Sequence, residues 1–224
     1  MFKKVVIANR GAVAARLVQT LKKMNVASVA LYSEADAALL YVEEADEKVL
    51  LGPGPAPQSY LNQDAVLEAA KNSGADAVHP GYGFLAENHE FAEKVIAAGL
   101  TFIGPDPKWL KIMGDKTASK DLMAGEGFPI SPSTGILQGS PEEQAAQAAS
   151  GGFPRLSKPA GGGGGSGMTP VLEESKLAQA IGSAGKLAVR SFGRPALYAE
   201  RLLENPRHVE FQIVCDRQNR GVHL

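Results

Sequence analysis

Apolar and amphipathic segments alternate regularly along the first half of the chain. Five short segments rich in β-branched and apolar residues are predicted to be strands: residues 4–10, 27–34, 47–52, 75–81 and 100–105. Between them lie four segments with apolar residues at helical spacing, which predict helices: residues 11–24, 35–42, 62–74 and 87–99. Strands separated by amphipathic helices predict a parallel sheet that is covered on both faces.

Two polar loops follow strands of this predicted sheet. They are "ANRGA" at 8–12, after the first strand, and "HPGYGFLAEN" at 79–88, after the fourth. Ligands of open α/β sheets collect beyond the carboxyl ends of the strands. We therefore expect any ligand of this domain to contact these loops, and we expect Asn9 and Arg10 to organise the first of them.

The pattern changes near residue 110. Helices are predicted at 107–127, with Gly114 as an interruption, at 140–150, with Ser140 as its N-cap and Pro141 at its first position, and at 173–192. Strands are predicted at 153–158, 167–172, 195–203 and 207–216. The chain is thus expected to contain two domains, residues 1–112 and 113–224.

Composition narrows the class of protein. Lysine and arginine total 23 against 24 acidic residues, a net charge of −1 that predicts no basic surface for nucleic acid. The single cysteine excludes a disulfide within the chain. No apolar run approaches the ~20 residues of a membrane span, and the apolar run after the N-terminus is too short for a signal peptide. We expect a soluble, cytoplasmic protein with no membrane contact.

The segment "LSKPAGGGGGSGM", residues 156–168, contains five consecutive glycines. A flexible linker would explain them, but both flanks resemble strands, which favours the turn of a hairpin. Pro170 disfavours a helix directly after the loop, so a dinucleotide-binding fingerprint is not indicated. The alternative is a flap whose backbone N–H groups close over phosphates, with Lys158 supplying a positive charge.

Six motifs in order carry a resemblance to a known family: "KVVIANRGAVAAR", "HPGYGFLAEN", "FIGP", "MGDK", "KPAGGGGGSGM" and "ENPRHVE". Together they resemble the biotin carboxylases, the ATP-grasp subunits or domains of biotin-dependent carboxylases. The resemblance implies an α/β fold, in which a Rossmann-like, pre-ATP-grasp N-terminal domain precedes the first part of an α+β ATP-grasp domain. It also implies a reaction: bicarbonate attacks the γ-phosphate of Mg-ATP to give carboxyphosphate, and CO2 passes to a ring nitrogen of biotin.

The resemblance also implies roles for residues. Those expected at ATP are Lys116, Lys158, Gly161, Gly162, Gly163, Gly164, Gly165, Glu200, Leu203 and His208. Those expected at the biotin side of the cleft are Tyr82, Gly83 and Glu87. The implied cofactors are ATP and Mg2+ or Mn2+, with biotin as the carboxyl acceptor. The implied partners are a biotin carboxyl carrier protein or domain and a carboxyltransferase, and family members commonly assemble, which suggests a homodimer.

The predicted strand at 207–216 has two contrasting faces. Val209, Phe211, Ile213 and Cys215 share one face, and His208, Glu210 and Gln212 share the other. The polar face is compatible with the lining of a cleft and equally with the solvated face of a half-exposed sheet.

The sequence departs from the family pattern in two places. Arg155 and Ser157 put polar groups on a strand that should be largely buried, and Ser166 replaces a residue that is basic in many members. The family's metal-binding carboxylates, and its residues for bicarbonate and biotin, lie beyond residue 224. We therefore assign no catalytic residue or metal ligand within the chain, and expect a truncated enzyme with weak or no activity alone.

Two other functions stay open. One is a different ATP-grasp ligase, of the carbamoyl-phosphate or purine-pathway type, although the loop at 79–88 resembles the biotin carboxylases in particular. The other is a non-catalytic nucleotide-binding or association fragment. The final acyl acceptor of a holoenzyme is chosen by a partner domain and is not indicated by these residues.

Overall fold

The computed structural model describes residues 1–150, 152–159, 168–192, 196–216, 218 and 220–224. The chain divides into two units, Met1–Ser119 and Lys120–Leu224. The division falls within helix α6, Lys116–Gly125. In the part of the chain that the structure describes, no helix combines the length and the apolar character needed to span a bilayer.

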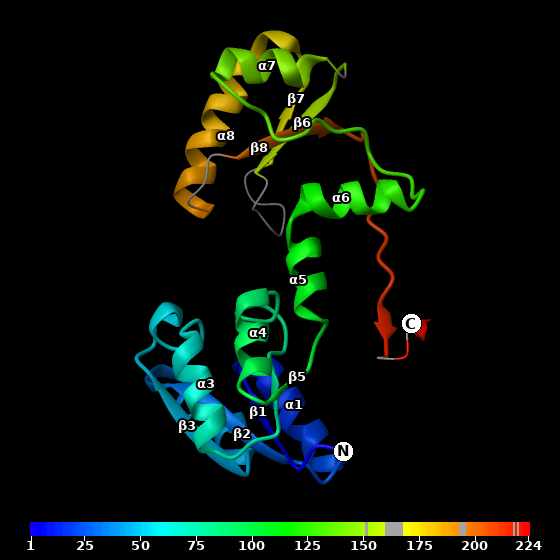
Figure 1. Ribbon diagram of the computed structural model, residues 1–224. Coiled ribbons are helices and arrows are strands. Elements are labelled where there is room, and N and C mark those ends of the chain that lie inside the picture. Colours follow the sequence, from blue (N-terminus) through cyan, green and yellow to red (C-terminus); the bar gives the residue numbers. More distant parts are fainter. Residues whose placement is uncertain (151, 160–167, 193–195, 217, 219) are drawn as a thin grey trace. The chain divides into compact units, whose positions relative to one another are not determined.

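The first unit is built on a five-stranded parallel sheet of order β3-β2-β1-β4-β5 (Figure 1). Its strands are β1 Lys4–Ile7, β2 Ala27–Ser33, β3 Glu47–Gly52, β4 Ala77–His79 and β5 Thr101–Phe102. Its helices are α1 Gly11–Lys23, α2 Leu40–Glu44, α3 Gln63–Asn72, α4 His89–Ala97 and α5 Pro107–Gly114, with 3-10 turns η1 Glu34–Asp36 and η2 Ala56–Gln58. The predicted parallel sheet with helices between its strands is confirmed.

Alternate residues of the central strands supply two cores, one on each face of the sheet. Val6 and Val29 pack with residues of α3 and α4, including the fully buried Phe91. Val5 and Ala30 pack with residues of α1 and α2. Because both faces are covered, β1 is apolar at every position from Val5 to Ile7 rather than alternating, as expected for a buried parallel strand.

The second unit contains a three-stranded antiparallel sheet of order β7-β6-β8. Its strands are β6 Arg155–Pro159, β7 Thr169–Val171 and β8 Leu197–Arg201, and its helices are α7 Pro141–Ala149 and α8 Leu177–Phe192, the latter preceded by the 3-10 turn η3 Glu174–Lys176. Both helices contribute to the core of this unit, which includes Leu197 and Ala199 of β8. The predicted hairpin around the glycine segment is confirmed by the pairing of β6 with β7.

Helix boundaries follow the capping signals in the sequence. Ser140 and Glu143 form a complete capping box at the start of α7, with Pro141 at the first helical position. Gly74, just beyond α3, has φ of +63°, a conformation that suits glycine after a helix end. Asp115 separates α5 from α6, so the predicted interruption near Gly114 is also confirmed.

The predicted strand at 207–216 is wrong over most of its length. Only β9, Ile213–Cys215, is a strand, and it pairs with β10, Gly221–His223, in an antiparallel hairpin. The apolar side chains expected to be buried are exposed, 67% for Val209 and 72% for Phe211. An isolated two-stranded hairpin has no second layer to bury an apolar face, so alternation in the sequence did not produce a buried strand here.

Candidate functional site

Asn9 fastens the loop that follows β4 in the first unit. Its Nδ2 atom donates hydrogen bonds to the carbonyl oxygens of Pro80, at 2.7 Å, and Tyr82, at 2.8 Å. A Cβ at Gly81 would lie 2.6 Å from Val13 and 2.7 Å from Asn9, so only glycine fits this approach. The loops after β1 and β4 are thereby held together.

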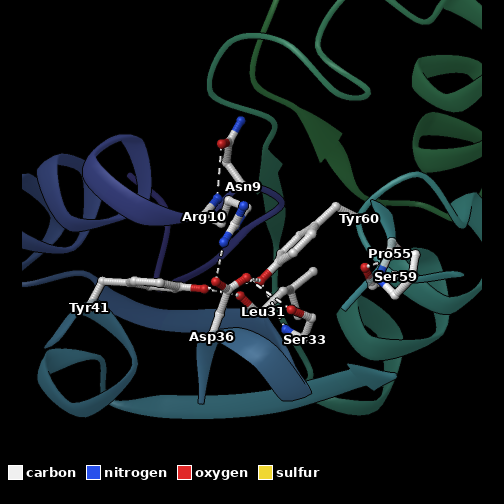
Figure 2. A network of polar contacts seen from close by, with 9 residues as sticks. All are labelled: Asn9, Arg10, Leu31, Ser33, Asp36, Tyr41, Pro55, Ser59 and Tyr60. Atoms are coloured by element: carbon white, nitrogen blue, oxygen red, sulfur yellow. Dashed lines mark hydrogen bonds and ion pairs between the residues drawn. The ribbon is translucent and has the colours of Figure 1, made fainter. Parts of the chain in front are cut away.

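A buried polar network lies at the carboxyl end of β2 (Figure 2). The carboxylate of Asp36 accepts hydrogen bonds from the Arg10 guanidinium, from Ser33 Oγ at 2.9 Å and from Tyr60 OH at 2.7 Å. Tyr41 OH lies 3.2 Å from Tyr60 OH. Burial by itself raises the pKa of Asp36, but the hydrogen bonds outweigh it and hold the pKa below its usual value.

The Asp36 carboxylate finds all these hydrogen-bond donors within the first unit. Asp36 is only 2% exposed, and each of its two carboxylate oxygens has a donor among its neighbours. In dinucleotide-binding folds an acidic residue near this strand end is free to bind a ribose hydroxyl. Here the carboxylate is occupied by Arg10, so the network orders the loop after β1, which is the structural role predicted for Arg10.

The sheet of the second unit has two chemically different faces. Arg155 and Ser157 share one face of β6, and Leu156 and Lys158 share the other, because side chains alternate along a strand. Leu156 lies opposite Glu200 of β8, and Lys158 lies opposite Tyr198. Lys158, Tyr198 and Glu200 therefore point to the same side of the sheet.

On this side Glu200 binds two lysines, one with each carboxylate oxygen. Oε1 accepts from Nζ of Lys158, and Oε2 accepts from Nζ of Lys120 in α6 at 2.6 Å. The Lys120 ammonium also lies 5.1 Å from the centroid of the Tyr198 ring, a cation–π contact. Below, Glu200, Lys120, Lys158 and Tyr198 are called the Glu200 cluster.

The electrostatics of this cluster keep its carboxylate charged. Burial by itself raises the pKa of Glu200, but the hydrogen bonds from Lys120 and Lys158 outweigh it and lower the pKa. Burial, together with the nearby charge of Glu200, raises the pKa of Tyr198 to about 12, so its hydroxyl stays protonated at neutral pH. Two ammonium groups and one carboxylate leave the cluster with one net positive charge.

The opposite face of β6 carries the polar groups that depart from the family pattern. Arg155 is 2% exposed and Ser157 is 1% exposed, on the side that packs on the core of the second unit. Arg155 Nε and Ser157 Oγ have no hydrogen-bond partner among the described residues. Burial and the neighbouring charge of Arg201 lower the pKa of the Arg155 guanidinium. The predicted burial of these two polar side chains is confirmed.

The other predicted site residues are placed as follows. Lys116 begins α6 in the first unit. Tyr82, Gly83 and Glu87 all lie exposed in the loop between β4 and α4, and Leu203, just after β8, is 58% exposed. The structure pairs His208 with Glu210, Nε2 to Oε1 at 2.8 Å, and does not bring it into the Glu200 cluster. Gly161 to Gly165 and Ser166 lie outside the described residues.

Sequence reasoning missed Lys120. The segment "KTASK" places it four residues after Lys116, and residues at this spacing share a face of a helix. A second lysine on the same face as one already expected at a phosphate was therefore a usable signal. Over the described residues, no group of three or more His, Cys, Asp or Glu side chains is placed to hold a metal ion.

Comparison with known families divides the chain in two. Residues 1–110 match the model described as biotin carboxylase, N-terminal domain. Residues 115–224 match the model described as carbamoyl-phosphate synthase L chain, ATP binding domain. The Glu200 cluster lies wholly within the second matched segment.

Two curated relatives align with the whole chain. The biotin carboxylase of Pseudomonas aeruginosa is 45% identical over 225 residues, and the biotin carboxylase of Halalkalibacterium halodurans is 43% identical over 224 residues. Both alignments cover 100% of this chain and 50% of those proteins. The chain thus spans about half the length of the curated relatives it matches.

Solved structures give the same result. A biotin carboxylase–β,γ-ATP complex from Campylobacter jejuni has a TM-score of 0.95 at 38% identity. The alignment covers 100% of this chain and 50% of the Campylobacter jejuni chain. The biotin carboxylase domain dimer of 2-oxoglutarate carboxylase from Hydrogenobacter thermophilus, in complex with MgADP, ADP and bicarbonate, has a TM-score of 0.94 at 41% identity. It covers 100% of this chain and 49% of that one.

Proposed function

The chain belongs to the biotin carboxylase family, and from this premise we propose that it supplies the nucleotide-binding half of an ATP-dependent ligase that carboxylates biotin. One observation carries the proposal: the Glu200 cluster gathers two lysines on one face of a sheet, in the segment that matches an ATP-binding domain. Ammonium groups held at a partly buried surface are suited to bind the phosphates of a nucleotide.

In the proposed reaction bicarbonate attacks the γ-phosphate of ATP to form carboxyphosphate, and biotin accepts the CO2 that carboxyphosphate releases. Lys158 and Lys116 bind phosphate oxygens and stabilise the charge that develops during phosphoryl transfer. Glu200 and Leu203 line the adenine pocket, and His208 contacts the nucleotide; the flap expected at glycines 161–165 lies outside the described residues. The position of Lys158 and Glu200 on one sheet face supports the roles of these two residues.

The metal of Mg-ATP is not assigned to this chain. Mg2+ prefers several oxygen ligands, including carboxylates, and the described residues offer no suitable group of acidic side chains. No step is therefore attributed to a metal held by these residues.

The loop between β4 and α4 is proposed to contact biotin through Tyr82, Gly83 and Glu87. Asn9 fixes the backbone of this loop, while the Tyr82 side chain is 75% exposed and free to contact a ligand. A biotin carboxyl carrier protein or domain would deliver the biotin, and a carboxyltransferase would use the product. A homodimer is proposed by analogy with the Hydrogenobacter thermophilus domain, which forms a dimer.

Replacing Lys158 by alanine is expected to weaken the binding of Mg-ATP to the 224-residue chain. The loss should be about 1.5–3 kcal/mol, the scale of a hydrogen bond to a charged group. Isothermal titration calorimetry measures it, with Lys186→Ala, which removes an exposed lysine of α8, as the matched control. Equal affinity in the wild type and Lys158→Ala would remove Lys158 from the site, and no binding by the wild type would refute the proposed function of this chain.

A second candidate is a ligase of the carbamoyl-phosphate type, because the model matching residues 115–224 carries that description. The match of residues 1–110 to the biotin carboxylase N-terminal domain favours the first candidate. ATP hydrolysis measured with bicarbonate, with and without free biotin, separates the two. Stimulation by biotin supports biotin carboxylation, and bicarbonate-dependent hydrolysis that biotin leaves unchanged supports the second candidate. ATP binding without hydrolysis supports a nucleotide-binding fragment.

A further inference from the structure

Lys120 occupies a position that the proposed nucleotide site leaves without a role. Its ammonium is held by two groups of β8, the Glu200 carboxylate at 2.6 Å and the Tyr198 ring at 5.1 Å. Its side chain is only 23% exposed. A lysine with two partners in a partly buried position is held in place by the fold and is not a freely solvated surface charge.

Glu200 poses an electrostatic problem for a phosphate site. Its side chain is 11% exposed and charged, and it already holds Lys158, the lysine proposed to bind phosphate. If Lys158 moved to a phosphate, Glu200 would keep a buried charge close to a polyanion. Removing one partner of a buried ion pair is costly, because the charge that remains is uncompensated.

Lys120 resolves this problem because it binds the other carboxylate oxygen. Since the two lysines bind different oxygens of Glu200, Oε2 would still have Lys120 as its partner if Lys158 left Oε1. We propose that Lys120 is a positioning residue of the nucleotide site: it neutralises Glu200, so that Lys158 can exchange the carboxylate for the phosphates of ATP. The inference rests on the proposed function and adds to it a residue and an exchange of partners.

The test compares four forms of the 224-residue chain: wild type, Lys120→Met, Lys120→Met combined with Glu200→Gln, and the control Lys186→Met. Methionine keeps the unbranched shape of the lysine stem and removes its charge. Calorimetry measures the dissociation constants of Mg-ATP and of adenosine, which lacks phosphates. Urea unfolding of each form shows separately how much stability has changed.

Lys120→Met is expected to weaken Mg-ATP binding about tenfold, at the lower end of the effect of one hydrogen bond to a charged group, and to leave adenosine binding unchanged. The added Glu200→Gln is expected to restore the part of the affinity that depends on the phosphates, because the uncharged amide does not hold Lys158 as the carboxylate does. Since Glu200 is also proposed to line the adenine pocket, the Mg-ATP affinity of the double variant is compared with the adenosine affinity of that same variant. A purely structural role of Lys120 would not produce this rescue.

Three results would overturn the inference. Wild-type affinity in Lys120→Met would show that Glu200 needs no second cation. Weaker binding that Glu200→Gln does not restore would show that Lys120 acts on the ligand directly or only on stability. A wild-type chain that binds no Mg-ATP would refute the proposed function and the inference with it, whereas the first two results leave the proposed function standing.

Discussion

Replacing Arg155 by methionine is expected to stabilise the second unit by about 1–4 kcal/mol, the range found when buried ionic groups give way to packed hydrophobic side chains. Arg155 is 2% exposed on the core face of β6, and its Nε has no partner among the described residues. It lies directly opposite Arg201 on β8, so like charges face each other across the two strands. Methionine fills the space of the arginine stem without a charge to desolvate.

Hydrogen exchange localises this effect. Exchange of the backbone amides of β6 and β8 measures the stability of the second unit. Trp109, the only tryptophan in the sequence, lies in the first unit, so its fluorescence measures the stability of that unit. Arg207→Met, at an exposed position of the second unit, is the matched control and should change stability by less than about 0.5 kcal/mol. Faster exchange of these amides in Arg155→Met would mean that the buried guanidinium is compensated after all.

The first unit was predictable because its signals are local and agree with one another. The run of apolar residues in β1, the helical spacing of Val13, Leu17 and Leu21 in α1, and the glycine after α3 each point to one structure. The capping residue Ser140 and the following proline were equally clear for α7. In the first unit most strands and helices are a few residues shorter than predicted. The helix predicted at 35–42 is wrong in position, because the structure has the 3-10 turn Glu34–Asp36 there and α2 only at Leu40–Glu44.

The prediction failed where the outcome depends on what covers a segment. Alternation at 207–216 predicted a strand with a buried face, yet Phe211 and Val209 are exposed. A pattern with a period of two shows which residues share a face, but a second layer is needed to bury that face.

The Glu200 cluster was half predictable. Lys158 and Glu200 are 42 residues apart in the chain, and the resemblance named both. Only the register of β6 against β8 shows that they are diagonal neighbours and form an ion pair. Lys120, which completes the cluster, was indicated by its spacing from Lys116 but by no motif.

Replacing Asp36 by alanine is expected to destabilise the first unit by about 2–3 kcal/mol at neutral pH, somewhat less than the usual cost of breaking a buried ion pair. The reduction follows because the Arg10 side chain is 47% exposed and can regain water. The hydroxyl groups of Ser33 and Tyr60, by contrast, lose an acceptor in a buried site. Urea unfolding followed by Trp109 fluorescence measures the change.

The pH dependence of this effect distinguishes a charged acceptor from a packing defect. The pKa of Asp36 is lower in the folded state than its usual value of 3.8, so its contribution is complete above that value and is lost as the pH falls through the folded-state pKa. The difference in the free energy of unfolding between wild type and Asp36→Ala should therefore be constant from about pH 5 to pH 7 and shrink below about pH 4.

Glu68→Ala, which removes an exposed carboxylate of α3, is the matched control and should shift stability by less than about 0.5 kcal/mol across this range. A difference for Asp36→Ala that persists unchanged to pH 2 would assign the loss to packing, and would remove the Arg10–Asp36 pair as the interaction that secures the loop after β1.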